Sequence, residues 1–310
     1  MITTVTLNAS VDKLYIIKSF EPGTVIRLSS GRNSAGGKGL NVTRILKQIG
    51  AEVRAIGLLG GHNGKFIEQE LFLLGIDSDF THLSEESRFC LNILETSSGR
   101  QTEFLEKGPS INEAALSDFS ERYLKALAAS SVVTLSGSLP PGLDSGYYAH
   151  LVALAKEKGL KVILDTRGDS LIKGLKNGPT VVKPNLEEAG ELLGREVKTL
   201  EQAAQATGFL RNQGAELATV SMGAQGLVAA TKDAVYHVSP PKIKAINTVG
   251  CGDSLVAGLA AGFDLGWPTA ELLKYGVAVS AASAMTMETG TLVKKDLDSI
   301  IPLVKIVKLD

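Results

Sequence analysis

A glycine-rich stretch near the C-terminal end carries the residues best suited to chemistry. Residues 247–254 read NTVGCGDS, so Gly250 and Gly252 flank Cys251 and precede Asp253. The uncharged run LVAGLAAGF follows, which predicts a buried helix that begins at this turn. Amide groups in the first turn of a helix lack intrahelical partners and bind anions such as phosphate. Asp253 could then accept a proton from a hydroxyl group that attacks a phosphate, or it could serve only as a helix N-cap worth about 1 kcal/mol.

A second glycine-rich turn occurs near the N-terminal end. Residues 35–42 read AGGKGLNV and lead into a helical pattern. Gly37, Lys38 and Asn41 fit a second anion site, because the Lys38 ammonium group would lie beside exposed amide groups only if an anion offset its charge. A tight turn with a helix cap is the alternative. Two anion sites are what the transfer of phosphate between two molecules requires.

A third group of residues suits the nucleotide side of such a reaction. Lys183 and Asn185 are followed by Glu188, which places an amide and a carboxylate three residues apart at a predicted helix start. The pair could face a hydrated Mg²⁺ on nucleotide phosphates, or it could form a capping box with Asn185 as N-cap. Backbone close to a nucleotide is expected at Ser221, Gly223 and Gly226.

Three charged residues could complete the acceptor side. Asp12 ends the first strand pattern and could hold sugar hydroxyl groups, or it could be a turn residue. Arg27 and Arg88 could bind a substrate phosphate through bidentate contacts, and a solvated surface position explains each of them equally well.

Composition limits the class of protein. The 310 residues are 44% apolar and 21% charged with a formal net charge of −1, so no global field recruits nucleic acid or an anionic membrane. The two cysteines, Cys90 and Cys251, match no metal or redox spacing. No apolar run approaches the ~20 residues of a membrane helix. We expect a cytoplasmic protein.

The elements that must position these residues alternate between strands and helices. Short apolar strands end in polar or glycine residues at 136–138, at 165–167, at 183–185 and at 221–226. Helical patterns of ten or more residues separate them, which predicts an α/β protein with a mostly parallel sheet covered by helices on both faces. Such sheets bind ligands at the carboxyl ends of their strands.

Two regions break this alternation. Residues 88–107 have the pattern of a β-hairpin around the turn SSGR, and residues 12–34 alternate weakly, with short β pieces at 15–17 and 25–28. We predict that the two regions form a small β-sheet lid on a single domain spanning residues 1–310.

Other nucleotide-binding signatures are missing from the sequence. Around Lys38 and around Lys65 the spacing of a Walker loop is not met, and no Gly-x-Gly-x-x-Gly follows the first strand. A Rossmann-type oxidoreductase is therefore a weak alternative.

With these motifs in place, the chain resembles the PfkB (ribokinase-like) family of carbohydrate kinases. The stretch NTVGCGD at 247–253 is similar to the C-terminal signature of that family, and GGKGLNV at 36–42 is similar to its N-terminal signature. The stretches at 6–12, 136–140 and 101–106 resemble the branch that acts on ketohexose phosphates, with tagatose-6-phosphate kinases nearest and 1-phosphofructokinases next. Cys251 departs from the small Ala or Ser usual there, and Ala9 departs from Pro.

The resemblance implies a ribokinase-like fold with MgATP as the phosphate donor. It implies Asp253 as general base and the amides of Gly250, Cys251 and Gly252 as the anion site. It also implies a sugar-phosphate site made by Asp12, Gly37, Lys38, Asn41 and Arg88, with Arg27 as a further member. A homodimer formed through the lid is expected in this family.

The function that we predict is ATP-dependent phosphorylation of the free primary hydroxyl of a ketohexose phosphate, giving tagatose 1,6-bisphosphate. The alternatives are 1-phosphofructokinase and 6-phosphofructokinase activity, which both give fructose 1,6-bisphosphate. A non-catalytic sugar-phosphate sensor on the same fold is an alternative from another class.

Overall fold

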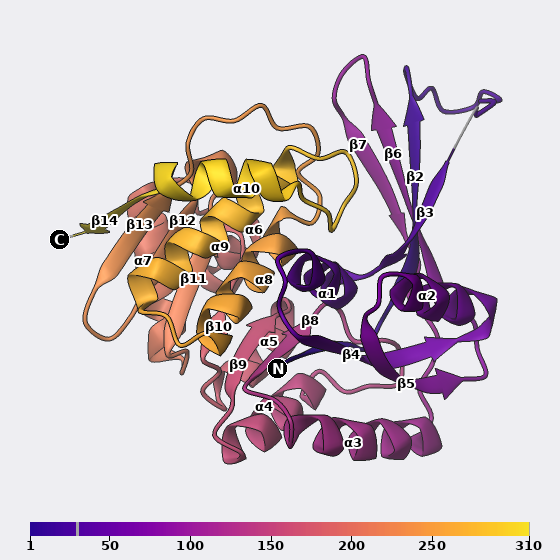
Figure 1. Ribbon diagram of the computed structural model, residues 1–310, viewed down its shortest axis with the longest axis horizontal. Coiled ribbons are helices and arrows are strands. Elements are labelled where there is room, and N and C mark those ends of the chain that lie inside the picture. The colour runs from indigo at the N-terminus through magenta and orange to yellow at the C-terminus, as the bar shows by residue number, and fades with distance from the viewer. Residues whose placement is uncertain (29–30, 310) are drawn as a thin grey trace.

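A large twisted sheet forms the centre of the molecule (Figure 1). The computed structural model describes residues 1–28 and 31–309, and within them this sheet has ten strands in the order β14-β13-β12-β11-β10-β9-β8-β1-β4-β5. The strands from β5 to β11 in that order pair in parallel, whereas β12, β13 and β14 pair antiparallel. The strands are β1 (Ile2–Thr6), β4 (Val53–Gly60), β5 (Asp77–Leu83), β8 (Val132–Ser136), β9 (Lys161–Asp165), β10 (Val181–Val182), β11 (Leu217–Ser221), β12 (Leu227–Ala230), β13 (Val235–Ser239) and β14 (Lys305–Leu309).

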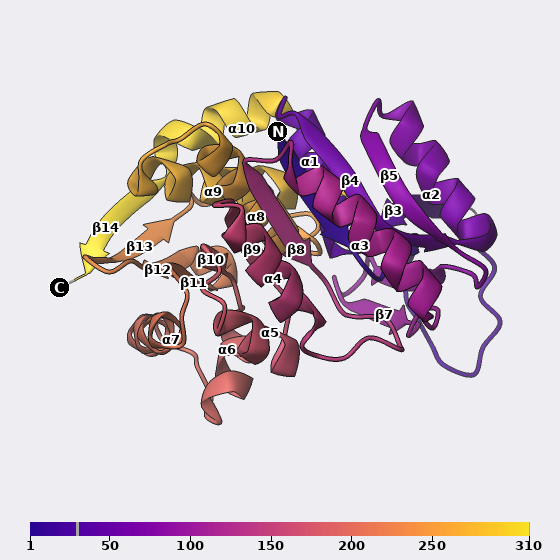
Figure 2. The ribbon, with the colours of Figure 1, turned by 90° about the horizontal axis from the view of Figure 1, so that it is seen from below.

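Helices cover both faces of the sheet, as Figure 2 shows from below. One layer consists of α1 (Lys38–Gln48), α2 (Gly61–Leu73), α8 (Cys251–Asp264), α9 (Thr269–Ala284) and α10 (Lys294–Ile300). The other layer consists of α3 (Glu113–Leu127), α4 (Tyr147–Glu157), α5 (Gly168–Leu175), α6 (Leu186–Leu193) and α7 (Leu200–Asn212). Short 3₁₀ turns occur at η1 (Gly223–Gln225) and η2 (Ile301–Leu303). The predicted α/β architecture is confirmed.

The apolar side chains form separate cores on the two faces of the sheet. The core on the α8 face includes Val256, Leu259 and Ile45, and the core on the α3 face includes Phe119 and Tyr148. Helix α8 lies against α9 so closely that a Cβ atom on Gly258 would lie 2.7 Å from the Cα of Gly276. No helix in the described part of the chain is long and apolar enough to cross a bilayer.

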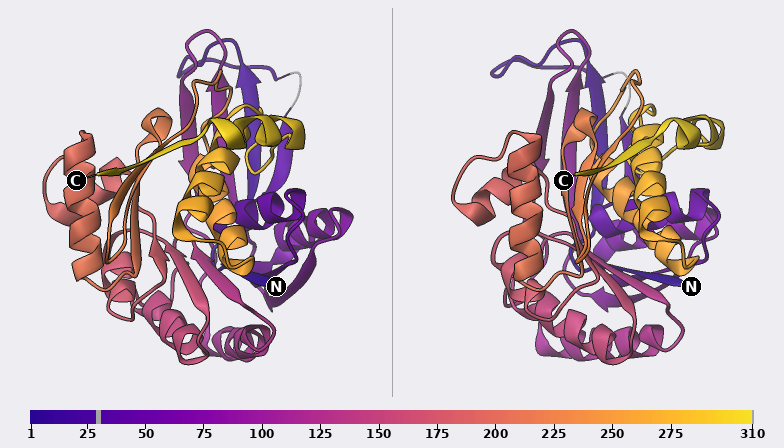
Figure 3. Two further views of the ribbon diagram at one scale, coloured as in Figure 1. Left: turned by 60° about the vertical axis from the view of Figure 1, so that its left-hand side comes forward. Right: turned by 90° about the vertical axis from the view of Figure 1, so that its left-hand side faces the viewer.

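A second sheet projects from the edge of the molecule and forms the lid (Figure 3). Its strands are β3 (Arg32–Gly36), β2 (Ser10–Ile17), β6 (Arg88–Glu95) and β7 (Gln101–Leu105), in that order. The predicted hairpin is present as the antiparallel pair β6–β7. The predicted β piece at 25–28 is wrong, because those residues form no strand and are exposed. The strands also extend beyond the expected limits, since β2 begins at Ser10 and β3 ends at Gly36.

Candidate active site

The glycine turn before α8 has the conformation that the sequence requires. Gly250 is the N-cap of α8 with φ of 78°, a left-handed value that favours glycine. The Cys251 amide donates to the Thr248 carbonyl at 3.3 Å, whereas the amides of Gly252 and Asp253 have no backbone acceptor among the described residues. These two N–H groups are therefore open to an anion at the positive end of the helix.

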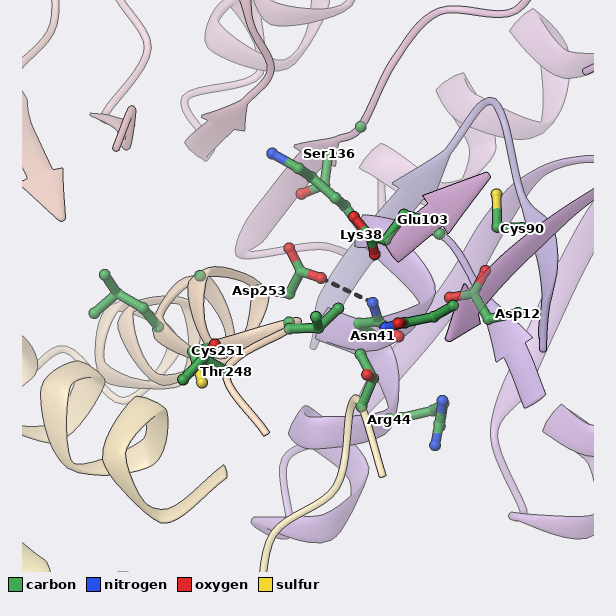
Figure 4. A pocket seen from close by; sticks show the side chains of 18 of the residues that line it. Asp12, Lys38, Asn41, Arg44, Cys90, Glu103, Ser136, Thr248, Cys251 and Asp253 are labelled. Carbon is green, nitrogen blue, oxygen red and sulfur yellow. Dashed lines mark hydrogen bonds between the residues drawn. The ribbon is translucent and has the colours of Figure 1, made fainter. Parts of the chain in front are cut away.

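Asp253 is not an N-cap. It is the third residue of α8, and its side chain makes no capping hydrogen bond. The Asn41 Nδ2 group donates to its Oδ2 at 2.8 Å, a bond drawn in Figure 4. Burial, which leaves Asp253 only 5% exposed, raises the pKa of its carboxyl to about 7, although the Lys38 ammonium and Asn41 act in the opposite direction. A carboxylate with a pKa near the working pH is suited to general base catalysis.

Two lysines flank this carboxylate and share one partner. Lys38 Nζ lies 3.3 Å and Lys183 Nζ 3.5 Å from Oδ1 of Asp165, which directly follows the apolar run of β9. Burial would raise the pKa of Asp165, but the Lys183 and Lys38 ammonium groups hold it below its usual value. The Asp165 carboxylate in turn raises the pKa of Lys38. Lys38 therefore stays positively charged.

Lys183 lies beside the glycine turn. A Cβ atom built on Gly252 would lie 3.1 Å from Lys183 Nζ, so a side chain there would displace the ammonium group from the turn. Lys38 is 37% exposed and faces the same space from α1. Ammonium groups and main-chain amides thus converge where a phosphate would lie.

Asn185 and Glu188 form the capping box of α6. Asn185 Oδ1 accepts from the Glu188 amide at 2.8 Å, and Glu188 Oε2 accepts from the Asn185 amide at 3.0 Å. The other carboxylate oxygen of Glu188 lies 3.9 Å from Lys38 Nζ. The structural role that the spacing suggested is present, and it leaves one oxygen facing the cavity.

One end of the site is formed by the base of the lid and the turn before α1. Asp12 accepts a 2.6 Å hydrogen bond from the Ser10 hydroxyl, and a Cβ atom on Gly36 would overlap its carboxylate. Burial raises the pKa of Asp12, against the lowering effect of Ser10, Arg88 and the Gly37 amide. The Arg88 guanidinium donates to the carbonyl oxygens of Asn8 and Glu106 at 3.0–3.1 Å, which fixes its orientation without neutralising its charge.

A cavity of about 1790 Å³ connects these groups. Its volume exceeds the ~300–1,000 Å³ of a typical small-molecule site, which leaves space for two substrates. Fifteen predicted site residues line it: Asp12, Gly37, Lys38, Asn41, Arg88, Lys183, Asn185, Glu188, Ser221, Gly223, Gly226, Gly250, Cys251, Gly252 and Asp253. Arg27 does not line it, and lies exposed on the segment between β2 and β3.

Gly226 also has a purely structural requirement for glycine. Its φ is 91°, and a Cβ atom there would overlap the carbonyl oxygen of Val238. Gly223, with φ of 56°, has open space around the position of a Cβ atom. Of the two, Gly223 is the position where backbone faces free volume.

Three further residues, for which sequence motifs predict no role, line or border the cavity. Asp165 contacts both lysines. Its position at the end of an apolar strand is the sequence feature that could have identified it as a site residue. Arg44 on α1 is buried and donates to the Ala35 carbonyl at 3.2 Å. Glu103 on β7 faces the cavity, and partial burial together with Asp12 raises the pKa of its carboxyl.

The whole chain matches one family of known proteins. The model of the pfkB family carbohydrate kinases matches residues 2–296. The chain belongs to the pfkB family of carbohydrate kinases. It is an ATP-dependent carbohydrate kinase, and a sensor without catalytic activity and a Rossmann-type oxidoreductase are thereby set aside.

The kinase is similar to characterised proteins over its full length. A tagatose-6-phosphate kinase of Staphylococcus epidermidis is 40% identical over 315 residues, covering 100% of both chains. The structure of phosphofructokinase-2 from Escherichia coli in complex with fructose-6-phosphate has a TM-score of 0.88 at 26% identity, covering 97% of this chain and 98% of that one. A ribokinase from Arabidopsis thaliana complexed with ribose and ATP has a TM-score of 0.78 at 20% identity, with the same coverage. This last likeness shows that the fold is ribokinase-like.

Proposed function

We propose that this kinase transfers the γ-phosphate of ATP to the free primary hydroxyl of tagatose 6-phosphate, giving tagatose 1,6-bisphosphate and ADP. The full-length identity of 40% to a tagatose-6-phosphate kinase is the observation that carries the choice of sugar. The cavity supports the chemistry, because a buried carboxylate with a raised pKa lies at a helix start whose open amides suit an anion.

Asp253 is the general base of the proposed mechanism. Its carboxylate takes the proton of the primary hydroxyl as that oxygen attacks the γ-phosphorus and the bond to the leaving ADP oxygen breaks. The raised pKa of about 7 makes the carboxylate a stronger base than an exposed aspartate, and the Asn41 amide orients it. The proton stays on Asp253 until the product leaves.

Amides and lysines stabilise the transferring phosphoryl group in this proposal. The N–H groups of Gly252 and Asp253 are open at the first turn of α8, and Lys38 and Lys183 approach the same space from two other elements. Phosphoryl transfer depends mainly on positioning and on the stabilisation of negative charge, so these fixed groups supply what the reaction needs.

The carboxylate oxygens at and near Glu188 suit Mg²⁺ as a metal ion. Asp165 Oδ2 is buried and has no hydrogen-bond partner among the described residues, and one oxygen of Glu188 faces the cavity. No three His, Cys, Asp or Glu side chains in residues 1–28 and 31–309 gather into a metal cage. This donor set fits a hydrated ion held mainly by the nucleotide phosphates, with Glu188 contacting it through water. Bound there, Mg²⁺ would neutralise charge on those phosphates.

The acceptor lies between Asp253 and the base of the lid in this proposal. Asp12 accepts hydrogen bonds from sugar hydroxyl groups, and Asn41 and the Gly37 amide contact the sugar beside the reacting end. Lys38 contacts the acceptor at this reacting end. Arg88 attracts the phosphate that the sugar already carries, because no carboxylate among the described residues pairs with it. Arg27 remains a proposed contact, one that requires the segment between β2 and β3 to approach a ligand.

The nucleotide lies on the other side of the glycine turn. Lys183 and Asn185 follow β10, and Ser221 is the last residue of β11. All three lie at the carboxyl edge of the sheet and line the cavity with Gly223 and Gly226. Open α/β sheets bind nucleotides at this edge, which supports the assignment.

Steady-state kinetics on three sugars tests the proposal. We expect kcat/KM for tagatose 6-phosphate to exceed the values for fructose 6-phosphate and fructose 1-phosphate by at least about tenfold, since one lost polar contact costs about that much. ADP formation is measured with MgATP in each case. A preference for either fructose phosphate would make the enzyme a phosphofructokinase, the alternative that the similarity to phosphofructokinase-2 favours.

We also propose that two copies associate through their lids. Phe89 and Phe104 lie on neighbouring lid strands and are 37% and 53% exposed. Exposed aromatic side chains on a sheet face are typical of protein interfaces. Light scattering coupled to gel filtration should give twice the monomer mass for the natural chain and the monomer mass for Phe104→Lys. A monomer mass for the natural chain at micromolar concentration would contradict the proposal.

A further inference from the structure

The last strand of the lid is bonded to the segment that leads into the catalytic turn. Gln101 Nε2 on β7 donates to Asn247 Oδ1 at 3.1 Å, across 146 residues of chain. Among the described residues this is the one side-chain hydrogen bond that joins β7 to the large sheet and its helices. Because side chains alternate along a strand, Gln101 shares the inner face of the lid with the cavity-lining Glu103 and Leu105.

Asn247 is a junction between three segments. It is only 4% exposed, and its Oδ1 accepts from the Val249 amide at 3.0 Å as well as from Gln101. A bond from a side-chain oxygen to the amide two residues ahead fixes an Asx turn, here the start of the catalytic turn. On its other side, Asn247 Nδ2 donates to the Met287 carbonyl at 2.9 Å. The Asn247 side chain therefore ties the lid to the catalytic turn and to the loop after α9.

The loop after α9 supports the catalytic turn directly. Asn247 Nδ2 lies 3.4 Å from Thr289 Oγ1, and a Cβ atom on Gly250 would lie 2.5 Å from Thr289 Cγ2. The space between Gly250 and Thr289 is thus too small for a side chain at position 250, and Asn247 contacts the same threonine. A displacement of the Asn247 side chain would therefore disturb a residue that packs against the glycine turn.

We propose that Gln101 is a positioning residue that couples the location of the lid to the geometry of the phosphate-binding turn, and that it acts through Asn247. When the lid lies over the sugar, Gln101 supplies the second donor to the buried Asn247 oxygen and holds the turn in its catalytic form. When the lid moves away, that oxygen keeps a single donor, and the turn becomes freer to fluctuate. The amides are thus fully ordered only while the cavity is covered and water is kept from the reacting phosphate.

Kinetics of a lid variant and a matched control test the coupling. Gln101→Leu keeps the size of the side chain and removes the donor, and Thr102→Val changes the next residue of β7, which projects from the opposite face. We expect Gln101→Leu to lower kcat about 5- to 10-fold, the effect of one hydrogen bond made in the transition state, while the equilibrium Kd for ATP changes less than twofold. Thr102→Val should keep kcat within about twofold of the natural enzyme.

A double-mutant cycle separates action through Asn247 from a general loosening of the lid. In an Asn247→Ala background, which already lacks the junction, Gln101→Leu should change kcat by less than about twofold. A fall as large as in the natural background would mean that Gln101 acts by another route and would overturn the inference. An unchanged kcat for the single Gln101→Leu variant would overturn it as well.

Amide hydrogen exchange gives a readout that needs no substrate. The inference rests on the proposed kinase reaction, but the exchange rate of the Val249 amide does not depend on which sugar is phosphorylated. We expect exchange in residues 247–253 of the free full-length enzyme to be at least about fivefold faster in Gln101→Leu and unchanged in Thr102→Val. Equal rates in the natural chain and in Gln101→Leu would refute the coupling. If the natural enzyme turned over none of the three sugar phosphates, the proposed substrate would fail while this comparison still decided the role of Gln101.

Discussion

Removing the Asn41 amide should move the acid limb of the pH–rate profile upward. Asn41 Nδ2 donates a 2.8 Å hydrogen bond to Asp253 Oδ2, and Asn41 Oδ1 has no hydrogen-bond partner among the described residues. In the free enzyme Asn41→Leu therefore removes this one hydrogen bond, which favours the ionised form of Asp253; the sugar contact that it also removes lowers kcat/KM by the same factor at every pH. A hydrogen bond to a charged group contributes about 1.5–3 kcal/mol, which corresponds to about 1–2 units of pKa. The pKa of Asp253, about 7 in the natural enzyme, should then rise to roughly 8–9.

The magnitude of the effect on activity follows from the ionised fraction. At pH 7 that fraction falls from about one half to between 1% and 9%, so kcat/KM should fall a further 5- to 50-fold or about that much, and this part of the loss should disappear as the pH approaches 9.5. The loss of activity should be largest at low pH, because a general base must be deprotonated before it accepts a proton. The assay measures ADP formation from pH 5.5 to 9.5, and the ratio of variant to natural enzyme cancels the titration of the substrate phosphate.

Gln48→Leu is the matched control, since Gln48 also lies on α1 and lines the cavity but bonds to Gly290 rather than to Asp253. Its acid limb should stay near that of the natural enzyme. If Asn41→Leu loses activity equally at all pH values, the amide does not set the ionisation of Asp253, and the reasoning about the base is refuted.

Three further substitutions test other parts of the site. Gly250→Ala places a Cβ atom 2.5 Å from Thr289 Cγ2 at φ of 78°, so we expect kcat to fall at least about tenfold with a lower melting temperature, and unchanged values of both would contradict the packing argument. Burial and Asp253 raise the pKa of the Cys251 thiol to about 12, so iodoacetamide at pH 7 should modify it at least about 100-fold more slowly than an exposed cysteine; rapid modification followed by mass spectrometry would contradict this. Lys183→Met leaves Asp165 with Lys38 alone and removes a cation beside Gly252. The KM for ATP should therefore rise at least about tenfold, while the KM for the sugar phosphate changes little. Equal changes in both KM values would show that Lys183 does not act on the nucleotide side of the site.

The residues of the site could be predicted because their positions follow from local rules. Glycine turns before apolar helices predicted the starts of α1 and α8, and polar residues after short apolar strands predicted the binding edge. Parallel strands bring their carboxyl ends together whatever the length of the intervening chain, so Lys183 and Ser221 lie at the same edge of the sheet. Fifteen of the sixteen predicted site residues line the cavity.

What could not be predicted depends on contacts between distant segments. Lys38 and Lys183 share Asp165, and nothing in local spacing indicates which carboxylate two lysines 145 residues apart have in common. The expectation that Arg27 reaches the sugar rests on a predicted lid strand at residues 25–28. Those residues form no strand, because a weak alternation does not make a strand without a partner, and none of the described strands pairs with them.

The capping box at α6 shows a limit of another kind. The spacing of Asn185 and Glu188 allowed either a helix cap or a ligand, and the structure has the cap together with a free carboxylate oxygen. The sequence does not indicate which carboxylate oxygen of Glu188 closes the capping box and which one faces the cavity, because the fold decides this.

Turnover of Asp253→Asn tests the central claim most directly. The substitution keeps the shape of the side chain and removes its basicity, and a positioned base contributes about 10²–10⁴ in rate. We expect kcat with tagatose 6-phosphate to fall by that factor while calorimetry gives an ATP Kd within about threefold of the natural enzyme. A fall of less than about tenfold would show that Asp253 does not remove the proton, and the mechanism would be wrong.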